Sequence, residues 1–155
     1  MLVVTRLNNP VFTQQDSEFM LLALDEAQDA LTAGDYPVGA ALAVNGQLIG
    51  RARNSIMSEA QSAAHAEQKL LSAHSARLRN LARAGNGDDI CLYTTLEPCL
   101  MCLGVSVLHR VTRIVVACPD PHGGATGIDP GVLGVFYCDH WPKIESGLMR
   151  ERSAD

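Results

Sequence analysis

The sequence predicts an α/β protein in which helices cover both faces of a mixed β-sheet. Two apolar runs, residues 38–44 and 47–52, are joined by Asn45-Gly46, the strongest short signal for an antiparallel hairpin. Two further apolar runs, residues 90–95 and 113–118, are separated by a helical segment, and strands joined in this way are parallel with a right-handed crossover. A hairpin and a parallel unit in one sheet make it mixed, so we expect a three-layer α/β/α sandwich.

Length and composition indicate one domain. A chain of 155 residues, 47% hydrophobic and 19% charged, is long enough for one substantial core and too short for two, so we expect a single domain over residues 1–155. No stretch approaches the roughly 20 apolar residues of a membrane span, and the apolar run at the start is too short for a secretory signal. We therefore expect a reducing cytoplasm, in which Cys91, Cys118 and Cys138 are small buried or half-buried side chains and not disulfide partners.

The first predicted element, after an irregular arm over residues 1–12, is a helix. Thr13 or Asp16 can cap its start, and Gly34 ends it. Apolar residues recur on one face between these limits: Phe19, Leu22, Ala23, Ala27, Ala30 and Leu31. We expect this helix to pack against the sheet and to take no part in chemistry.

A loop, a helix and a turn are expected to lead from the hairpin to the third strand. Residues 53–63 are predicted to form the loop, and the helix that begins at His65 is predicted to continue through Leu78, because apolar residues recur up to that point. Residues 85–89 combine Gly, Asn and Asp, which are typical of a turn. The helix between the third and fourth strands is expected to end near His109.

The last part of the chain is expected to form a long loop and a weak strand. Residues 119–131 contain four Gly and three Pro, a composition typical of a loop, which we expect to lie over the functional site. Within it, Asp120 and His122 are candidates for substrate contact. Residues 143–146 are predicted to form a fifth strand that completes the sheet.

Four residues in two short motifs are the parts of a hydrolytic zinc site. Zn²⁺ binds Cys sulfur and His nitrogen readily, and a catalytic site uses three protein ligands with water in the fourth position. His65, Cys99 and Cys102 supply three such ligands. Glu67 is then left unligated beside the metal, where a carboxylate can accept a proton and pass it to a leaving group.

The spacing of these residues predicts how the site is built. Pro98 is expected at the first helical position, which places Cys99 and Cys102 on one face of the first turn. The positive end of the helix dipole there favours the thiolates that bind a metal. His65 and Glu67, two residues apart, converge on one point only if the metal lies off the start of their helix. We therefore expect two helix N-termini to face each other with zinc between them.

Several further blocks accompany these motifs in one order, over roughly residues 16–147: Tyr36-Pro37-Val38-Gly39-Ala40, Arg53-Asn54, Ala64-His65-Ala66-Glu67, Thr94-Thr95-Leu96-Glu97-Pro98-Cys99-Leu100-Met101-Cys102, and Asp120 with Gly124-Ala125-Thr126-Gly127. With these blocks the sequence resembles the cytidine deaminase-like superfamily, whose signature is H-x-E…P-C-x-x-C. In motif it is most similar to bacterial tRNA adenosine deaminases and to guanine and cytosine deaminases.

The resemblance implies a fold, a cofactor and a reaction. The fold is the cytidine deaminase-like sandwich, with a mixed five-stranded sheet in the strand order 2-1-3-4-5. The cofactor is Zn²⁺, and the reaction is hydrolytic replacement of an exocyclic amine by a carbonyl with release of ammonia. Glu67 would carry the proton to the ring nitrogen and then to the leaving amine. Members of the superfamily generally pair their subunits beside the active site, so a homodimer is expected.

The resemblance also implies which residues contact the substrate. Asn54 would hydrogen-bond the base, although a lone loop Asn is otherwise typical of a turn. Backbone groups of Ala66, Pro98 and Cys99 would line the floor of the pocket. The candidate substrate-binding residues are Asn54, Val38, Ala66, Pro98 and Asp120.

Three alternatives to a catalytic zinc site were open. A structural zinc site would need a fourth ligand, but no spare His or Cys stands in C-x-x-C or H-x-x-x-H spacing with another spare one. A redox C-x-x-C motif would leave His65 and Glu67 without a function. A non-catalytic zinc-stabilised binding module would have no need of the Glu67 carboxylate.

Charge decides the expected class of substrate. A net charge of −5 and scattered basic residues are unlike the basic patch of most RNA-binding proteins. The densest group, Arg77, Arg79 and Arg83, is explained by a solvated helix end. The residue after the His-Ala-Glu motif is Gln68, and only about eight residues follow the last strand. Both features are unlike the tRNA enzymes. We therefore expect a small aminated heterocycle, a nucleobase or nucleoside, as substrate, with tRNA adenosine-34 to inosine deamination as the alternative.

Overall fold

The structure is a computed structural model that describes residues 10–154. Most of the predicted N-terminal arm lies outside the described residues, and a single domain over residues 1–155 stays a prediction. Within the described range, no helix is both long and apolar enough to cross a membrane. The predicted location of the protein in the cytoplasm likewise stays a prediction.

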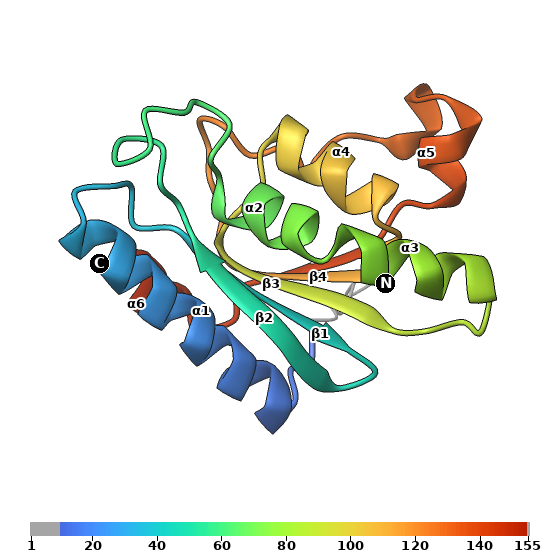
Figure 1. The fold of residues 1–155 in the computed structure, drawn as a ribbon, viewed down its shortest axis with the longest axis horizontal. Helices are drawn as coiled ribbons and strands as arrows, with labels where there is room; N and C mark the ends of the chain where they lie inside the picture. Colours follow the sequence, from blue (N-terminus) through green and yellow to red (C-terminus); the bar gives the residue numbers. More distant parts are fainter. Residues whose placement is uncertain (1–9, 155) are drawn as a thin grey trace, which may run out of the picture.

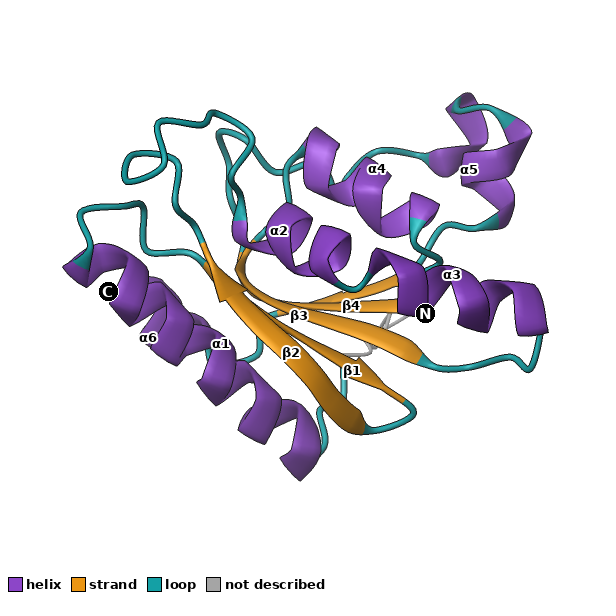
Figure 2. Ribbon diagram, in the orientation of Figure 1, coloured by secondary structure: helices purple, strands orange, loops and turns teal. Residues whose placement is uncertain are grey.

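Five strands form one mixed sheet in the order β2-β1-β3-β4-β5, as predicted (Figure 2). The strands are β1 (Gly39–Val44), β2 (Gln47–Arg53), β3 (Ile90–Leu96), β4 (Arg113–Cys118) and β5 (Lys143–Ser146). β1 pairs antiparallel with both β2 and β3, whereas β3, β4 and β5 run parallel to one another. The β1–β2 turn has Asn45 at φ 49° and Gly46 at φ 78°, the positive values that the predicted tight hairpin requires.

Helices cover both faces of this sheet (Figure 1). One face carries α1 (Gln14–Thr32) and the short α6 (Arg150–Ala154), and the other carries α2 (Ala66–Ala73), α3 (Ser75–Ala84) and α4 (Leu100–Leu108). Alternate residues of β1 and β3 point to opposite faces and join two separate apolar cores. The predicted three-layer sandwich is confirmed.

Local sequence signals explain where α1 begins and ends. Thr13 is the N-cap residue, and its side chain accepts a hydrogen bond from the Asp16 backbone N–H at 3.0 Å. The Asp16 carboxylate in turn accepts the Thr13 N–H at 2.9 Å, which completes a capping box. Gly34, at φ 83°, follows the end of the helix, as predicted.

The long helix predicted from His65 through Leu78 is wrong, because His74 divides it into α2 and α3. His74 has φ −105° and ψ 12°, outside the helical range, and it caps both helices. Its imidazole lies over Gly50 of β2, where a Cβ atom would overlap the ring. This contact joins residues far apart in the sequence, so the apolar spacing along one helix cannot reveal it.

Two short helices were also missed. The α5 helix (Val135–Asp139) and α6 are five residues long each, too short for a periodic pattern to show. The structure places the five cysteines as free thiols, with Cys91 buried and Cys118 half-buried. Cys138 on α5 is exposed, contrary to the expectation that it would be buried or half-buried.

Candidate metal and catalytic site

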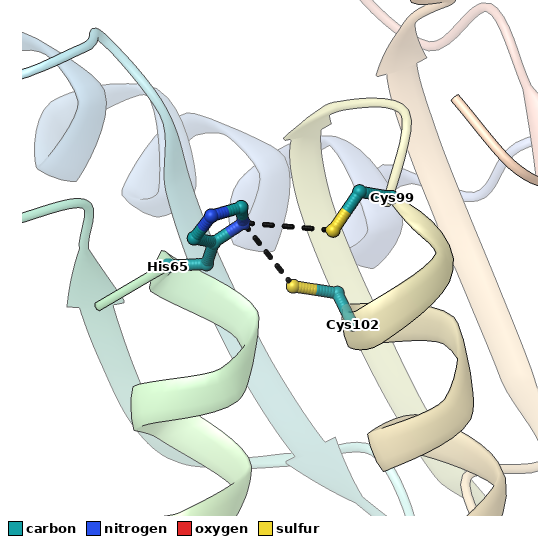
Figure 3. Close-up of side chains that lie close together, drawn as sticks. All are labelled: His65, Cys99 and Cys102. Atoms are coloured by element: carbon teal, nitrogen blue, oxygen red, sulfur yellow. Dashed lines mark hydrogen bonds between the residues drawn. The ribbon is translucent and has the colours of Figure 1, made fainter. Parts of the chain in front are cut away.

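Two helix starts face each other at one end of the sheet (Figure 3). His65 is the N-cap residue of α2, and Cys99 is the N-cap residue of α4. The predicted meeting of two helix N-termini is present. Pro98, however, was expected at the first helical position and instead precedes the N-cap, because α4 begins only at Leu100.

Three donor atoms converge between these helix starts. His65 Nδ1 lies 3.6 Å from the sulfur atoms of both Cys99 and Cys102. Bonds of roughly 2.3 Å to sulfur and 2.0–2.1 Å to nitrogen in a tetrahedron place N and S about 3.6 Å apart. Among the described residues no further His, Cys, Asp or Glu joins this group. The donor set therefore fits zinc with three protein ligands, and a fourth protein ligand is not found in the described part of the chain.

The two thiols are unlike each other. The pKa of Cys99 is lowered to about 5, because the Cys102 thiol and backbone N–H groups donate to its sulfur and His65 lies close by. The pKa of Cys102 is raised, because it donates to Cys99 and because it is buried near Glu67. A thiolate at Cys99 is thus stable even before a cation binds, which prepares the site for a metal.

Glu67 lies in the same place and does not belong to the donor group. Its side chain is buried, with 3% of the residue exposed, and burial raises the pKa of its carboxyl above the ordinary value. The Thr94 hydroxyl donates to Oε1 at 3.1 Å, and the Cys102 sulfur lies 3.5 Å from Oε2. A carboxyl group that is held in place and has a raised pKa is suited to accept and release a proton.

A cavity of about 250 Å³ opens beside these groups. It is slightly smaller than the roughly 300–1,000 Å³ of sites for drug-sized ligands, and it suits a single heterocycle. Ten residues line it: Tyr36, Val38, Asn54, Ile56, His65, Glu67, Leu96, Glu97, Cys99 and Asp120.

The predicted substrate-binding residues divide into two groups. Val38, Asn54 and Asp120 line the cavity. Ala66 and Pro98 do not: both are buried, and the Pro98 carbonyl accepts the Ala125 N–H at 3.0 Å. A place for these two residues in the pocket floor stays a prediction.

Asn54 combines the two roles that its sequence left open. Its Oδ1 accepts the Ile56 N–H at 3.0 Å, the local bond typical of a turn residue. Its side-chain nitrogen makes no hydrogen bond to any described residue, and Asn54 lines the cavity. One end of the amide is therefore structural, and the other is free to donate.

Glu97 is a residue of the site that sequence reasoning missed. Its carboxylate lines the cavity and accepts hydrogen bonds from the Asp120 N–H at 2.9 Å and from the Thr126 N–H at 3.1 Å, and also from the Thr126 hydroxyl. Burial raises its pKa, but these donors outweigh burial and leave the pKa below its ordinary value. The donors lie 23 and 29 residues away, so no local pattern marks this function.

Comparison with known proteins places the chain in a known family of sequences. Residues 13–118 match the model of the cytidine and deoxycytidylate deaminase zinc-binding region. The chain is 37% identical over 137 residues to a tRNA-specific adenosine deaminase of Bacillus subtilis, covering 88% of this chain and 83% of that one. It is 36% identical over 137 residues to the same kind of enzyme from Aquifex aeolicus, with 87% of each covered.

Solved structures agree with these matches. A structure from work on A-to-I editing by tRNA:A34 deaminases has a TM-score of 0.68 and 32% identity, covering 84% of this chain and 98% of that one. A guanine deaminase from Nitrosomonas europaea has a TM-score of 0.71 and 25% identity, covering 94% of this chain and 84% of that one. These similarities confirm the predicted fold.

Proposed function

This chain belongs to the cytidine and deoxycytidylate deaminase zinc-binding family and is a zinc-dependent deaminase, and we propose that it converts an adenosine in transfer RNA to inosine. The observation that carries the choice of substrate is the identity of 37% and 36% to tRNA-specific adenosine deaminases over most of both chains. This order reverses the one expected from composition, in which a small heterocycle came first. A non-catalytic binding module is not retained.

His65, Cys99 and Cys102 would hold the zinc. When bound, zinc supplies a Lewis acid that makes water a strong nucleophile at neutral pH. The reaction forms a bond from the water oxygen to C6 of the base and breaks the bond from C6 to the exocyclic nitrogen. Water and adenosine are consumed, and inosine and ammonia are released.

Glu67 moves the protons of this reaction. Its carboxylate accepts one proton from the attacking water and delivers it to the ring nitrogen next to C6. It then accepts the second proton of the same oxygen and passes it to the exocyclic amine, which leaves as ammonia. The raised pKa of Glu67 supports this function, because a carboxyl group that titrates nearer neutrality both accepts and donates readily. The hydrogen bond from Thr94 holds the carboxylate in place.

The remaining cavity residues orient the base. The free side-chain nitrogen of Asn54 donates to an acceptor on the ring, and Asp120 approaches from the loop over the site. Val38 supplies an apolar contact on the cavity wall. These three assignments are supported by the position of each residue in the cavity lining.

A small aminated base is the second candidate substrate, and one specific observation favours it. The cavity lining includes Glu67, Glu97 and Asp120 but no Lys or Arg, so the cavity itself has no group that would attract a phosphate. An uncharged heterocycle without a backbone fits such a lining. The similarity to a guanine deaminase structure points the same way.

A direct comparison of substrates tests the proposal. Ammonia release by the zinc-loaded protein is measured for an adenosine-34 tRNA, for its anticodon stem-loop, and for free adenosine, guanine and cytosine. We expect the highest kcat/KM for the RNA substrates, and the Glu67→Gln variant, with equal zinc content, serves as the blank. Turnover of free bases alone would reject the tRNA substrate and support the second candidate.

A further inference from the structure

One side chain, that of Glu97, forms hydrogen bonds to both ends of the loop over the site, residues 120–126. Glu97 directly follows β3 and stands two residues before Cys99. One of its carboxylate oxygens accepts the Asp120 N–H, and the other accepts the N–H and the hydroxyl of Thr126. Charged hydrogen bonds of this kind are roughly twice as strong as neutral ones. A single anion therefore holds the two ends of residues 120–126 together.

The neighbouring backbone strengthens the same attachment. The carbonyl of Pro98 accepts the Ala125 N–H at 3.0 Å, and the Gly124 N–H donates to the Asp120 carbonyl at 3.1 Å. The segment that leads into Cys99 is thus bonded to the loop at three positions: Asp120, Ala125 and Thr126. Asp120 is the loop residue that lines the cavity.

Gly124 shows how closely the loop approaches Glu97. A Cβ atom at Gly124 would overlap the Glu97 carboxylate and would lie 2.6 Å from the Asp120 carbonyl oxygen. Real Cβ atoms do not approach this closely, so any larger residue would push the loop away. The place of the loop therefore depends on both an anion at residue 97 and a glycine at residue 124.

From these contacts we propose that Glu97 is a positioning residue, which fixes the 120–126 loop as the roof of the cavity and holds Asp120 in contact with the substrate. Glu97 also lines the cavity, but both of its oxygens are occupied by loop donors, which separates it from Glu67. Substrate binding depends on this roof, whereas the chemical step depends on Glu67. The proposal rests on the proposed function only for the choice of substrate in the kinetic test.

The Glu97→Gln variant tests it, because an amide nitrogen cannot accept the Asp120 N–H. In the zinc-loaded protein without substrate, we expect amide hydrogen exchange in residues 120–126 to rise about 10-fold or more, with exchange in β4 unchanged. With an adenosine-34 anticodon stem-loop, we expect KM to rise about 10- to 100-fold while kcat changes less than about threefold. Zinc content should stay the same.

Three further variants grade the effect. Thr126→Val removes the hydroxyl donor alone and should raise KM less than Glu97→Gln does. Gly124→Ala should raise KM as strongly, and the Glu97→Gln/Gly124→Ala double variant should be little worse than either single one, because both release the same loop. Asp129→Asn is the matched control: its carboxylate accepts the Gly131 N–H at 2.9 Å outside the cavity, and no kinetic change is expected.

Three outcomes would overturn the proposal. A fall in kcat at unchanged KM would place Glu97 in the chemical step, and a loss of zinc would mean that it acts through Cys99. Unchanged amide hydrogen exchange in residues 120–126 would show that Glu97 does not hold the loop in place. If Glu97→Gln does not fold, Thr126→Val and Gly124→Ala decide by the same measurements. If the wild type does not deaminate the stem-loop, the proposed function fails, and the exchange measurement still decides the role of Glu97.

Discussion

At the scale of single residues, Glu67 is the group whose removal separates chemistry from metal binding. Glu67→Gln keeps the size of the side chain and an oxygen that accepts from Thr94, but it cannot transfer the proton. We expect kcat to fall by about 10²- to 10⁴-fold at an unchanged zinc content of about one per chain. Cys99→Ala should instead lose the metal. Zinc analysis and ammonia release on the same samples distinguish the two losses.

The exposed Glu18 on α1 provides the control for this experiment. Glu18→Gln makes the same chemical change far from the cavity lining and should leave kcat unchanged. Turnover by Glu67→Gln within a few-fold of wild type would contradict the assigned role, since an essential proton carrier cannot be replaced by an amide.

A second residue, Asp16, links stability to pH. Its side chain is 3% exposed and lies 2.7 Å from the Arg113 guanidinium. Burial raises the pKa of Asp16, but the hydrogen bonds from Arg113, Thr13 and Tyr93 outweigh burial, so the pKa lies well below its ordinary value of 3.8. A depressed carboxyl pKa adds stability above the unfolded-state value, and this stability is lost as pH falls through the folded-state value.

Asp16→Asn measures this contribution. At pH 7 we expect the variant to be less stable by about 3 kcal/mol, the order found when one partner of a buried ion pair is removed. Because Asn does not titrate, the difference should shrink as pH falls from 5 to 3. Urea unfolding of both metal-free proteins at several pH values provides the measurement. A difference that stays constant down to pH 3 would show that the charge of Asp16 contributes nothing.

At the scale of elements, α1 packs on the sheet through a glycine. A Cβ atom at Gly39, the first residue of β1, would overlap the Ala23 carbonyl and lie 2.6 Å from the Ala27 nitrogen. Gly39→Ala must therefore push α1 away, and we expect a loss of about 3 kcal/mol in the free energy of unfolding. Gly127→Ala is the control, since nothing lies within 4 Å of its Cβ position. Urea unfolding that gives the two variants equal stability would contradict this account of the packing.

Elements marked by local signals could be predicted from the sequence. The hairpin needs positive φ at Asn45 and Gly46, and the start of α1 needs a cap at Thr13, so a few adjacent residues determine each. The break at His74 could not be predicted, because it depends on a contact with Gly50 across the sheet. Amphipathic spacing is insensitive to a single non-helical residue.

The residues of the site also divide into those that the sequence could predict and those that it could not. The four residues of the two motifs could be placed together because each motif stands at the start of a helix, where the unpaired N–H groups and the dipole favour the same chemistry. The loop over the site was also expected, but its attachment through Glu97 could not be predicted, since the donors to Glu97 lie 23 and 29 residues further along the chain.

At the scale of the whole molecule, an exposed apolar stripe on α4 supports the expected homodimer. Leu100 and Leu108 are 65% and 57% exposed, and they lie on one face of the helix with Gly104 between them. We expect sedimentation at micromolar concentration to give twice the chain mass of 16.6 kDa. Leu108→Glu should dissociate the dimer, whereas Leu31→Glu on α1 should not. A species of the monomer mass alone in the wild type would reject the prediction.

The distribution of basic residues over the molecule determines how its activity on RNA should respond to salt. Of 12 Lys and Arg residues, the four that form ion pairs within the described chain are Arg51, Lys69, Arg113 and Lys143. None of those that lie within residues 10–154 lines the site cavity. Arg79, Arg83 and Arg110, in contrast, line a second cavity of about 440 Å³ against α3 and α4, without an acidic residue in its lining. Arg79 and Arg83 are exposed, whereas the Arg110 guanidinium stacks on the Phe136 ring, and we expect these residues to contact the phosphates of an RNA.

Two or three phosphate contacts predict a moderate salt dependence. Between 50 and 200 mM salt, kcat/KM for an adenosine-34 tRNA should fall by about 10- to 40-fold, far less than the roughly 10³- to 10⁵-fold of proteins with six to ten contacts. The Arg79→Ala/Arg83→Ala variant should lose most of this dependence and keep its zinc, because the variant lacks the charges that displace counterions from the RNA. Arg77→Ala, on the same helix but outside the cavity lining, is the matched control. A slope unchanged by the double variant would show that the RNA is bound elsewhere.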